Sequence, residues 1–162
     1  IIDHKLNCAE DATNLILYVD LDNFKYYNDT FGHDTGDFVL VSFTELFLKL
    51  IQNEGYVIRY GGDEFVLVIP NQTENYGQEL AEKIFSRVND GFKIRIEEYL
   101  QRNIFIPTDK KLSCSIGITE YTGTTHDDIE HALNNADQAL YFIKRNSKGH
   151  AMTWSKLKDF KI

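Results

Sequence analysis

The feature that most constrains the fold is an unbroken apolar run, Leu15-Ile16-Leu17-Tyr18-Val19, which ends abruptly in Asp20-Leu21-Asp22. The run is rich in strand-forming residues and lacks the apolar and polar alternation of a half-exposed strand. It therefore predicts a central strand that is buried on both faces and ends in charged residues.

Later segments predict a mixture of helices and strands. Apolar residues at intervals of three and four predict helices over about 39–51, 78–88 and 127–145, whereas 91–102 fits either a helix extension or an irregular excursion. Further strands are expected at 56–60, 64–69, 112–119 and 151–154, and the first two of these flank Gly61-Gly62-Asp63 as a hairpin. The resulting order, β-α-α-β-β-α-β-α-β, predicts an α/β (α+β) sandwich whose central mixed, mainly antiparallel sheet is flanked by helices.

Charge and cysteine content narrow the class of protein. The 162 residues carry 17 Lys and Arg against 25 Asp and Glu, a net charge of −8, which disfavours a polymeric nucleic acid or an anionic membrane surface as partner. Cys8 and Cys114 are far apart and form no paired motif, as expected for reduced thiols. With neither a secretory leader nor an apolar run of about 18 residues, the sequence predicts a soluble cytoplasmic domain, cut from a longer protein.

Three carboxylates fall where the backbone is expected to turn. Asp20 ends the central strand, and Asp63 and Glu64 lie at the hairpin. Such groups can converge on Mg²⁺, which favours one or two carboxylates together with water and substrate phosphates. Each carboxylate taken alone is equally compatible with an ordinary solvated turn. The neighbouring Gly61 and Gly62 fit either a turn that needs positive φ or a place where a ligand approaches the backbone.

The hairpin and its surroundings resemble a known family. Arg59-Tyr60-Gly61-Gly62-Asp63-Glu64-Phe65 is similar to the signature of the GGDEF diguanylate cyclases, which condense two GTP into cyclic di-GMP. Other segments match that family in order and spacing: Asp20-Leu21-Asp22-Asn23-Phe24-Lys25, Asn28-Asp29-Thr30-Phe31-Gly32-His33 through Gly36-Asp37, Ser113-Cys114-Ser115-Ile116-Gly117-Ile118, and Ala136-Asp137 through Lys144. The resemblance implies a catalytic domain over 15–154, after a poorly matched lead-in at 1–14 and before a tail at 155–162. It also implies a fold similar to the nucleotide cyclase core and the polymerase palm.

The resemblance implies a catalytic and metal centre. Asp20, Asp63, Glu64 and the backbone of Leu21 match the positions that hold Mg²⁺ (or Mn²⁺), and the three carboxylates match the catalytic residues. A ribose 3′-OH would attack an α-phosphate and displace pyrophosphate, with the metal stabilising the charge on the phosphoryl oxygens. Either Glu64 or Asp63 could accept the hydroxyl proton.

The resemblance also implies a substrate site. Asn28 and Asp37 match the guanine-binding pair, and a carboxylate at 37 would accept from the guanine N1–H and N2–H₂ groups but repel adenine. Without the motif, Asp37 would be interpreted as a helix-start carboxylate. Lys144 and Lys148 match phosphate-binding positions, the second of which is Arg in the family, and they share one face if the helix reaches Lys148. Their ordinary interpretation is as cations at a helix C-terminus. Lys25 is a further phosphate candidate, and Gly61 and Gly62 leave room for the ligand.

Two departures from the family concern regulation and the lead-in. Gln52 and Gly55 stand where many members carry the Arg and Asp of a product-inhibition site, so we expect that site to be absent. Asp3-His4-Lys5-Leu6-Asn7-Cys8 preserves almost none of the family's usual motif before the first strand. His126 and His131 fall within a zinc-site spacing, but no cysteine pair accompanies them, and we expect solvated or capping roles.

Two classes of function remain open at this point. The first is an active cyclase that works as a homodimer, because each subunit presents one GTP to the other. The second is a catalytically silent GTP-binding module that regulates an attached domain such as a phosphodiesterase. A cyclase with another base preference is disfavoured by Asp37. The intact Gly61-Gly62-Asp63-Glu64-Phe65 favours the active cyclase.

Overall fold

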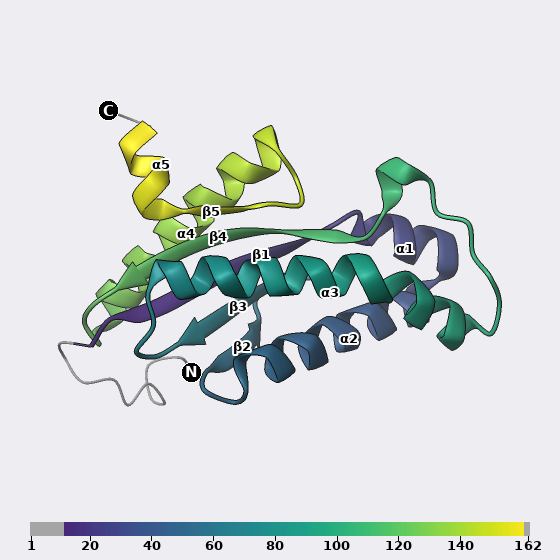
Figure 1. Cartoon of the computed structure of the whole chain (residues 1–162), viewed down its shortest axis with the longest axis horizontal. Coiled ribbons are helices and arrows are strands. Elements are labelled where there is room, and N and C mark those ends of the chain that lie inside the picture. Colours follow the sequence, from purple (N-terminus) through teal and green to yellow (C-terminus); the bar gives the residue numbers. More distant parts are fainter. Residues whose placement is uncertain (1–11, 161–162) are drawn as a thin grey trace.

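A computed structural model describes residues 12–160, which form one sheet and its covering helices (Figure 1). The strands are β1 (Asn14–Asp22), β2 (Tyr56–Arg59), β3 (Glu64–Ile69), β4 (Ser113–Tyr121) and β5 (Ala151–Thr153). The helices are α1 (Phe24–Phe31), α2 (His33–Ile51), α3 (Glu74–Leu100), α4 (His126–Asn146) and α5 (Trp154–Phe160), with a short 3₁₀ turn at Thr108–Lys110. Cys8, which is expected to be a reduced thiol, and most of the lead-in at 1–14 lie outside the described residues.

The sheet confirms the predicted mixed and mainly antiparallel topology. Its strand order is β2-β3-β1-β4-β5, with β1 antiparallel to β3 and β4, and β4 parallel to β5. β1 is therefore the central strand, and every residue from Leu15 to Val19 is buried. Its register places Asp20 opposite Glu64 of β3 and opposite Ser115 of β4.

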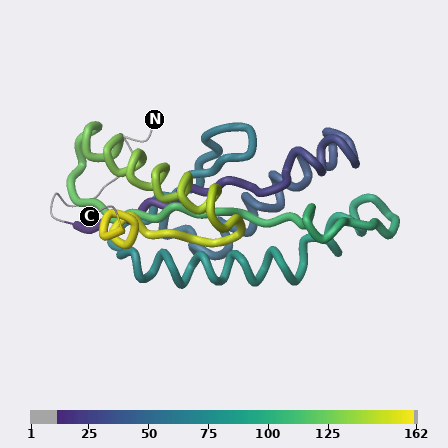
Figure 2. The backbone as a smooth tube through the Cα atoms, turned by 90° about the horizontal axis from the view of Figure 1, so that it is seen from above, coloured from purple at the N-terminus to yellow at the C-terminus, as the bar shows by residue number. Residues whose placement is uncertain are grey.

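Alternate side chains of β1 enter two separate cores, because successive residues of a strand point to opposite faces. Leu15, Leu17 and Val19 pack in the larger core, against α2 and α3. Ile16 and Tyr18 pack in the smaller core, against α4. Figure 2 shows α3 and α4 on opposite sides of the sheet. The chain is thus a sandwich of three layers, with the sheet in the middle.

Contact between α4 and β4 is unusually close at Gly117. A Cβ on Gly117 would stand 1.9 Å from the carbonyl oxygen of Ala136, so backbone packs directly on backbone at this point. The close approach fixes α4 relative to the sheet. It thereby sets the position of the C-terminal end of α4 beside the end of β1.

Several boundaries differ from the sequence prediction. Residues 91–100 extend α3, because Phe92 and Ile96 continue its buried face. Trp154 begins α5 and does not end β5, and residues 155–160 of the expected tail are helical because Leu157 is buried. Residues 161–162 lie outside the described part of the chain. None of the helices within 12–160 combines the length and apolar character that crossing a bilayer requires.

Candidate active site

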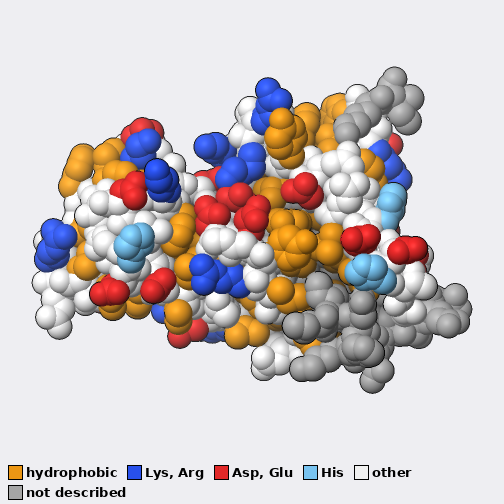
Figure 3. Space-filling model, turned by 180° about the vertical axis from the view of Figure 1, so that it is seen from behind, with side chains coloured by type: hydrophobic (Ala, Val, Ile, Leu, Met, Phe, Trp, Pro, Cys, Tyr) orange, Lys and Arg blue, Asp and Glu red, His pale blue; other side chains and the backbone are white. Residues whose placement is uncertain are grey.

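Three predicted carboxylates come together where β1 meets the β2–β3 hairpin. Asp20 and Glu64 are register partners on adjacent strands, and the N–H of Leu21 donates to the carbonyl of Asp63 at 3.0 Å. Both backbone polar groups of a strand residue face the same neighbour, so the carbonyl of Leu21 is also directed toward the hairpin. Asp20 shares the face of β1 that carries Ile16 and Tyr18, which is the face covered by α4. Acidic and basic side chains gather on the side of the molecule seen in Figure 3.

Lys144, in the last turn of α4, reaches into this group of carboxylates. Its Nζ lies 2.5 Å from Oδ1 of Asp20 and 3.4 Å from Oδ1 of Asp22. Burial lowers the pKa of Lys144, but the hydrogen bonds and charges of the two aspartates outweigh it and the pKa is raised. Lys144 is therefore held as an ammonium ion inside the carboxylate cluster.

The carboxylates are poorly compensated even with this ammonium present. Burial is the largest cause that raises the pKa of Asp20, with Asp63 and Asp22 adding to it and Lys144 opposing it. Burial likewise raises the pKa of Glu64, and the charges of Asp20 and Asp63 raise it further. A cation of higher charge would relieve this repulsion.

Asp22 is a residue of the site that the sequence analysis did not single out. It is only 2% exposed, and its carboxylate accepts from the hydroxyls of Ser113 (2.9 Å) and Ser115 (2.9 and 3.1 Å) and from the N–H of Gly149 (3.1 Å). The signal was present in the second aspartate of Asp20-Leu21-Asp22 and in the two serines of 113–115. It could not be interpreted without knowing that β4 lies beside β1.

The glycines of the hairpin do not adopt the conformation expected of a primed turn. The described glycines with positive φ are Gly32, Gly123 and Gly149, so neither Gly61 nor Gly62 supplies one, and that interpretation was wrong. A Cβ on Gly61 would lie 2.5 Å from Oε2 of Glu64, whereas a Cβ on Gly62 would meet nothing within 4 Å. The guanidinium of Arg59 donates to the carbonyls of Gly61 and Gly62 and holds the turn. Gly61 thus makes room for Glu64, and Gly62 leaves open space.

The two residues predicted to bind guanine lie on consecutive helices. Asn28 is in α1, and a Cβ on Gly36 of α2 would stand 1.7 Å from its Oδ1, so Asn28 packs against the first turns of α2. Asp37 is exposed and is the fifth residue of α2, whereas Asp34 occupies its first turn. Because the helix dipole acts mainly within the first turn, the helix-start interpretation of Asp37 was wrong.

The remaining phosphate candidates are Lys148 and Lys25, and the condition under which Lys148 would share a helical face with Lys144 is not met. α4 ends at Asn146, so Lys148 does not continue the helical face of Lys144 and lies exposed in the following turn. The helix stops there because Gly149, with a φ of 78°, directs its N–H to Asp22 and to Ser115. Lys25 is exposed on α1 and pairs with Asp29 at 3.8 Å. Lys25 forms no ion pair with the described carboxylates Asp20, Asp63 and Glu64, so its role stays a prediction.

The acidic residues suit a hard divalent cation. Asp20 and Asp63 offer carboxylates and Leu21 a carbonyl, which are the oxygen donors that Mg²⁺ prefers. No three acidic, histidine or cysteine side chains between residues 12 and 160 are already arranged as a complete ligand set. An incomplete set is usual for Mg²⁺, because water and substrate phosphates supply the other ligands. His126 and His131 are exposed near the start of α4, five residues apart, where the helix turns them to different faces.

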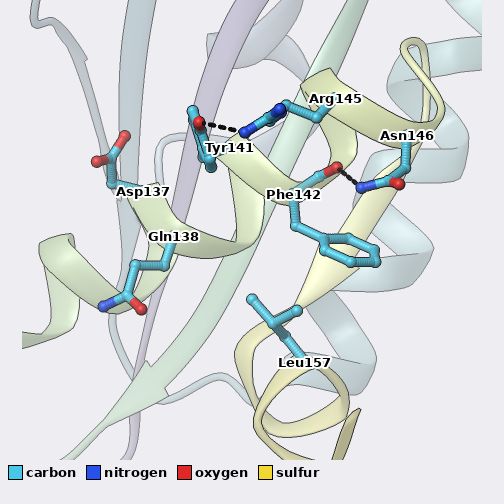
Figure 4. Close-up of a pocket in the computed structure, with 7 residues that line it drawn as sticks. All are labelled: Asp137, Gln138, Tyr141, Phe142, Arg145, Asn146 and Leu157. Atoms are coloured by element: carbon cyan, nitrogen blue, oxygen red, sulfur yellow. Dashed lines mark hydrogen bonds between the residues drawn. The ribbon is translucent and has the colours of Figure 1, made fainter. Parts of the chain in front are cut away.

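A separate hollow of about 600 Å³ lies along α4, and Leu157 of α5 is among the residues that line it (Figure 4). Within it, Arg145 donates to the hydroxyl of Tyr141 at 2.9 Å. Asp137, at one end of the hollow, also contributes to the raised pKa of Glu64. The hollow does not include Asp20, Asp63 or Glu64, so it is distinct from the carboxylate cluster.

Gln52 and Gly55, which stand where many family members carry a product-inhibition site, both have structural roles. Gln52 has a φ of 53° and caps the C-terminus of α2. A Cβ on Gly55 would lie 2.4 Å from the carbonyl oxygen of Val68, so no larger residue fits there without movement of β3. Neither position carries a guanidinium or a carboxylate.

Comparison with known proteins gives two informative relatives. Diguanylate cyclase DosC of Escherichia coli (strain K12) is 37% identical over 139 residues, which are 86% of this chain and 28% of DosC. Cyclic di-GMP phosphodiesterase PdeR of the same strain is 30% identical over 149 residues, which are 92% of this chain and 21% of PdeR. The chain therefore spans little more than a quarter of the length of DosC.

A solved structure and a family model indicate the same family as these two relatives. The active GGEEF domain of a diguanylate cyclase from Vibrio cholerae has a TM-score of 0.66 and 30% identity, covering 88% of this chain and 83% of that domain. A family model described as "Diguanylate cyclase, GGDEF domain" matches residues 1–150. With the Gly61–Phe65 hairpin placed against the end of β1, the chain belongs to the GGDEF domain family of diguanylate cyclases.

Proposed function

We propose that the chain is the catalytic domain of a diguanylate cyclase, with residues 15–154 as its functional unit. Two GTP molecules are condensed into cyclic di-GMP with release of two pyrophosphates. The observation that carries the proposal is the convergence of Asp20, Asp63 and Glu64, with the ammonium of Lys144 held among them. Membership of the GGDEF family supports the same activity.

Each condensation joins a ribose 3′-oxygen to an α-phosphorus and breaks the bond from that phosphorus to pyrophosphate. A bound Mg²⁺ or Mn²⁺ would supply electrostatic stabilisation of the phosphoryl and leaving-group oxygens. Asp20, Asp63 and the carbonyl of Leu21 would hold the ion, with Glu64 beside them. The ammonium of Lys144 then leaves Asp20 and pairs with the phosphates of the nucleotide. Either Glu64 or Asp63 accepts the 3′-hydroxyl proton, and Glu64 is preferred because it lies beside the ion and is not needed as one of its ligands.

Base selection is assigned to Asn28 and Asp37. The exposed carboxylate of Asp37 accepts from the N1–H and N2–H₂ donors of guanine, and adenine has an acceptor at N1 that would face it. Asn28 adds an amide beside it. Lys25 and Lys148 are exposed cations available to the outer phosphates, and Gly61 and Gly62 admit the ligand to the hairpin backbone.

Catalysis requires two copies of the chain. One site of this kind holds one GTP, and two 3′-to-α-phosphate bonds close the ring, so each subunit presents its nucleotide to the other in a homodimer. Because the chain spans 28% of the length of DosC, we assign it to a longer multidomain signalling protein. We also assign the domain to the cytoplasm, as expected from the sequence. The other parts of that protein would bring two catalytic domains together.

The activity is tested with protein dimerised by a fused coiled coil, incubated with GTP and Mg²⁺ and analysed by chromatography. Cyclic di-GMP and pyrophosphate are expected in a ratio of one to two, with Asp63→Asn as the inactive control. A dimer that binds GTP but forms no product would favour the second candidate, a silent module that regulates an attached domain. The 30% identity to PdeR, a phosphodiesterase, is the observation that keeps this second candidate.

A further inference from the structure

Asp22 differs from the other carboxylates of the site in being fully engaged by the protein itself. It is almost completely buried, and Ser113, Ser115 and Gly149 donate to its two oxygens at 2.9–3.1 Å. Lys144 lies 3.4 Å from one of these oxygens. Because a carboxylate offers about four acceptor sites, these donors leave Asp22 little capacity for a metal ion or substrate. Its function must therefore pass through the groups that it holds.

The partners of Asp22 come from three separate parts of the fold. Ser113 and Ser115 belong to β4, Lys144 to the last turn of α4, and Gly149 to the turn that carries Lys148. The N–H of Gly149 is shared between Asp22 and the hydroxyl of Ser115, each at 3.1 Å. One buried anion at the end of β1 thus fixes both the end of α4 and the turn after it.

Lys144 pairs with two carboxylates, Asp20 and Asp22, and only one of them is assigned to the metal in the proposed reaction. Asp20, at 2.5 Å, is assigned to the metal, and a divalent ion there would compete with the ammonium. Asp22 is sequestered by its serine and backbone donors and stays available to Lys144. The ammonium therefore keeps one anchor at the site when it leaves Asp20.

We propose that Asp22 is a positioning residue that keeps the Lys144 ammonium, and the turn bearing Lys148, in place to receive the β- and γ-phosphates of the nucleotide. The proposal rests on the proposed function, in which these lysines contact phosphate. It predicts that Asp22 matters for the triphosphate and has little effect on recognition of the nucleoside end.

The first test compares the affinity of the wild-type chain and of Asp22→Asn for GTP and for GMP, each with Mg²⁺, by calorimetry. Loss of a charge-assisted contact corresponds to a weakening of about tenfold to a hundredfold for GTP. Affinity for GMP is expected to change by less than about twofold, because its phosphate does not reach the two lysines. Equal weakening for both nucleotides would show a general structural role and overturn the proposal.

The second test asks whether Asp22 acts through Lys144. In a Lys144→Met background, adding Asp22→Asn is expected to weaken GTP binding by a smaller factor than it does in the wild type, because one of the two groups that Asp22 positions is already absent. Full additivity of the two substitutions would contradict the mechanism. A steady-state measurement of the dimerised enzyme should show the Asp22→Asn effect mainly in KM.

A milder variant keeps the test informative if Asp22→Asn does not fold. Ser113→Ala with Ser115→Ala retains the carboxylate but removes the hydroxyls that fix it, and a selective loss of GTP over GMP affinity is again expected. Unchanged GTP affinity in this folded variant would overturn the proposal. Failure of the proposed function itself is distinguishable, because then the wild-type dimer would form no cyclic di-GMP under any of these conditions.

Discussion

The ammonium of Lys144 lies 2.5 Å from Oδ1 of Asp20, although 124 positions separate the two residues in the chain. The contact exists because α4 packs closely on β4, at Gly117, and so ends beside the end of β1. Burial and the neighbouring acids raise the pKa of Asp20 and so destabilise its anionic form. Lys144 compensates this effect with a single positive charge. Substrate and metal must replace this contact before the proposed reaction can begin.

Replacing Lys144 by Met is expected to affect two ligands in opposite directions. Binding of Mn²⁺ alone should become about tenfold tighter, because the competing ammonium is gone. Binding of GTP should become weaker, because a phosphate contact is lost. Calorimetry with each ligand checks both signs, and Lys144→Arg, which retains the charge, should not strengthen Mn²⁺ binding. A Lys144→Met variant that bound both ligands more weakly would contradict competition at Asp20.

Asp63→Asn is expected to lower cyclic di-GMP formation at least a hundredfold while the protein remains folded. The amide removes a charged oxygen donor for the metal, and such electrostatic stabilisation is worth several kcal/mol in the transition state. Chromatography of the product measures turnover, and thermal melting should give a midpoint within a few degrees of wild type. Asp159→Asn, at an exposed position on α5, is the matched control and should retain full activity.

The variants Gly61→Ala and Gly62→Ala distinguish two reasons for glycine in the hairpin: space for the Glu64 side chain and space for the nucleotide. The methyl at 61 would stand 2.5 Å from Oε2 of Glu64, so Glu64 must move and kcat should fall about tenfold or more. The methyl at 62 meets nothing in the free protein, so stability should be unchanged or slightly higher. A raised KM for GTP in Gly62→Ala would then report close approach of the nucleotide to this backbone. Unaltered kinetics in both variants would argue against the hairpin as the reaction centre.

Gly36→Ala tests the placement of Asn28. Alanine favours a helix over glycine by about 0.5–1 kcal/mol, but the new methyl at 36 would fall 1.7 Å from Oδ1 of Asn28. We expect the amide to be displaced, the helix gain to be cancelled and GTP affinity to fall several-fold. Gly91→Ala is the matched control, because it lies within α3 and its Cβ meets nothing within 4 Å. It should stabilise the protein by up to about 1 kcal/mol in urea unfolding and leave GTP affinity unchanged.

Asp37→Asn tests base selection. An amide can both donate and accept, so the repulsion of the adenine N1 acceptor is removed and one strong acceptor for guanine is lost. We expect the ratio of GTP to ATP affinity to fall by tenfold or more, mainly through weaker GTP binding. Competition of both nucleotides against a fluorescent GTP analogue measures the ratio. An unchanged ratio would remove Asp37 from the guanine site.

Local sequence patterns predicted the parts of the fold whose causes are local. The apolar run 15–19 is buried on both faces, and its position as the central strand follows from that burial alone. The carboxylates at 20, 63 and 64 converge because each stands at the end of a predicted element. The helical pattern also predicted the end of α4 to within one residue, since α4 ends at Asn146. The path of the turn after it could not be predicted in this way, because that turn is held by the bond from Gly149 to Asp22, which lies 127 positions away.

The extension of α3 shows the same limit. Beyond Val88 the buried face of α3 is narrow, with Phe92 and Ile96 as its buried side chains, so apolar periodicity is weak there. Tertiary contacts supply what the pattern lacks: Arg95 lies over the rings of Phe38 and Phe92, and Tyr99 stacks on Phe38 at 4.2 Å. A helix stabilised mainly by a partner element cannot be identified with certainty from its own sequence.

Tyr27 links α1 to the segment before β4 and gives a pH-dependent prediction. Burial raises the pKa of Tyr27 to about 12, against a partly opposing hydrogen bond in which its hydroxyl oxygen accepts from the N–H of Leu112 at 3.0 Å. The folded protein therefore keeps the phenol neutral where the unfolded chain, with a pKa near 10, already releases the proton. Between these values the folded state binds more protons, so the free energy of unfolding falls as pH rises from about 10 to 12.

Tyr27→Phe should remove this contribution to alkaline destabilisation. At pH 8 the variant is expected to be less stable by about 1–2 kcal/mol, because the buried N–H of Leu112 loses its acceptor. From pH 10 to 12 its free energy of unfolding should decline less steeply than that of wild type, by up to about 1.4 kcal/mol per pH unit. Urea unfolding at several pH values measures both quantities, with exposed Tyr99→Phe as the control for other phenols. Parallel curves for wild type and Tyr27→Phe would show that this phenol is not held neutral by its burial.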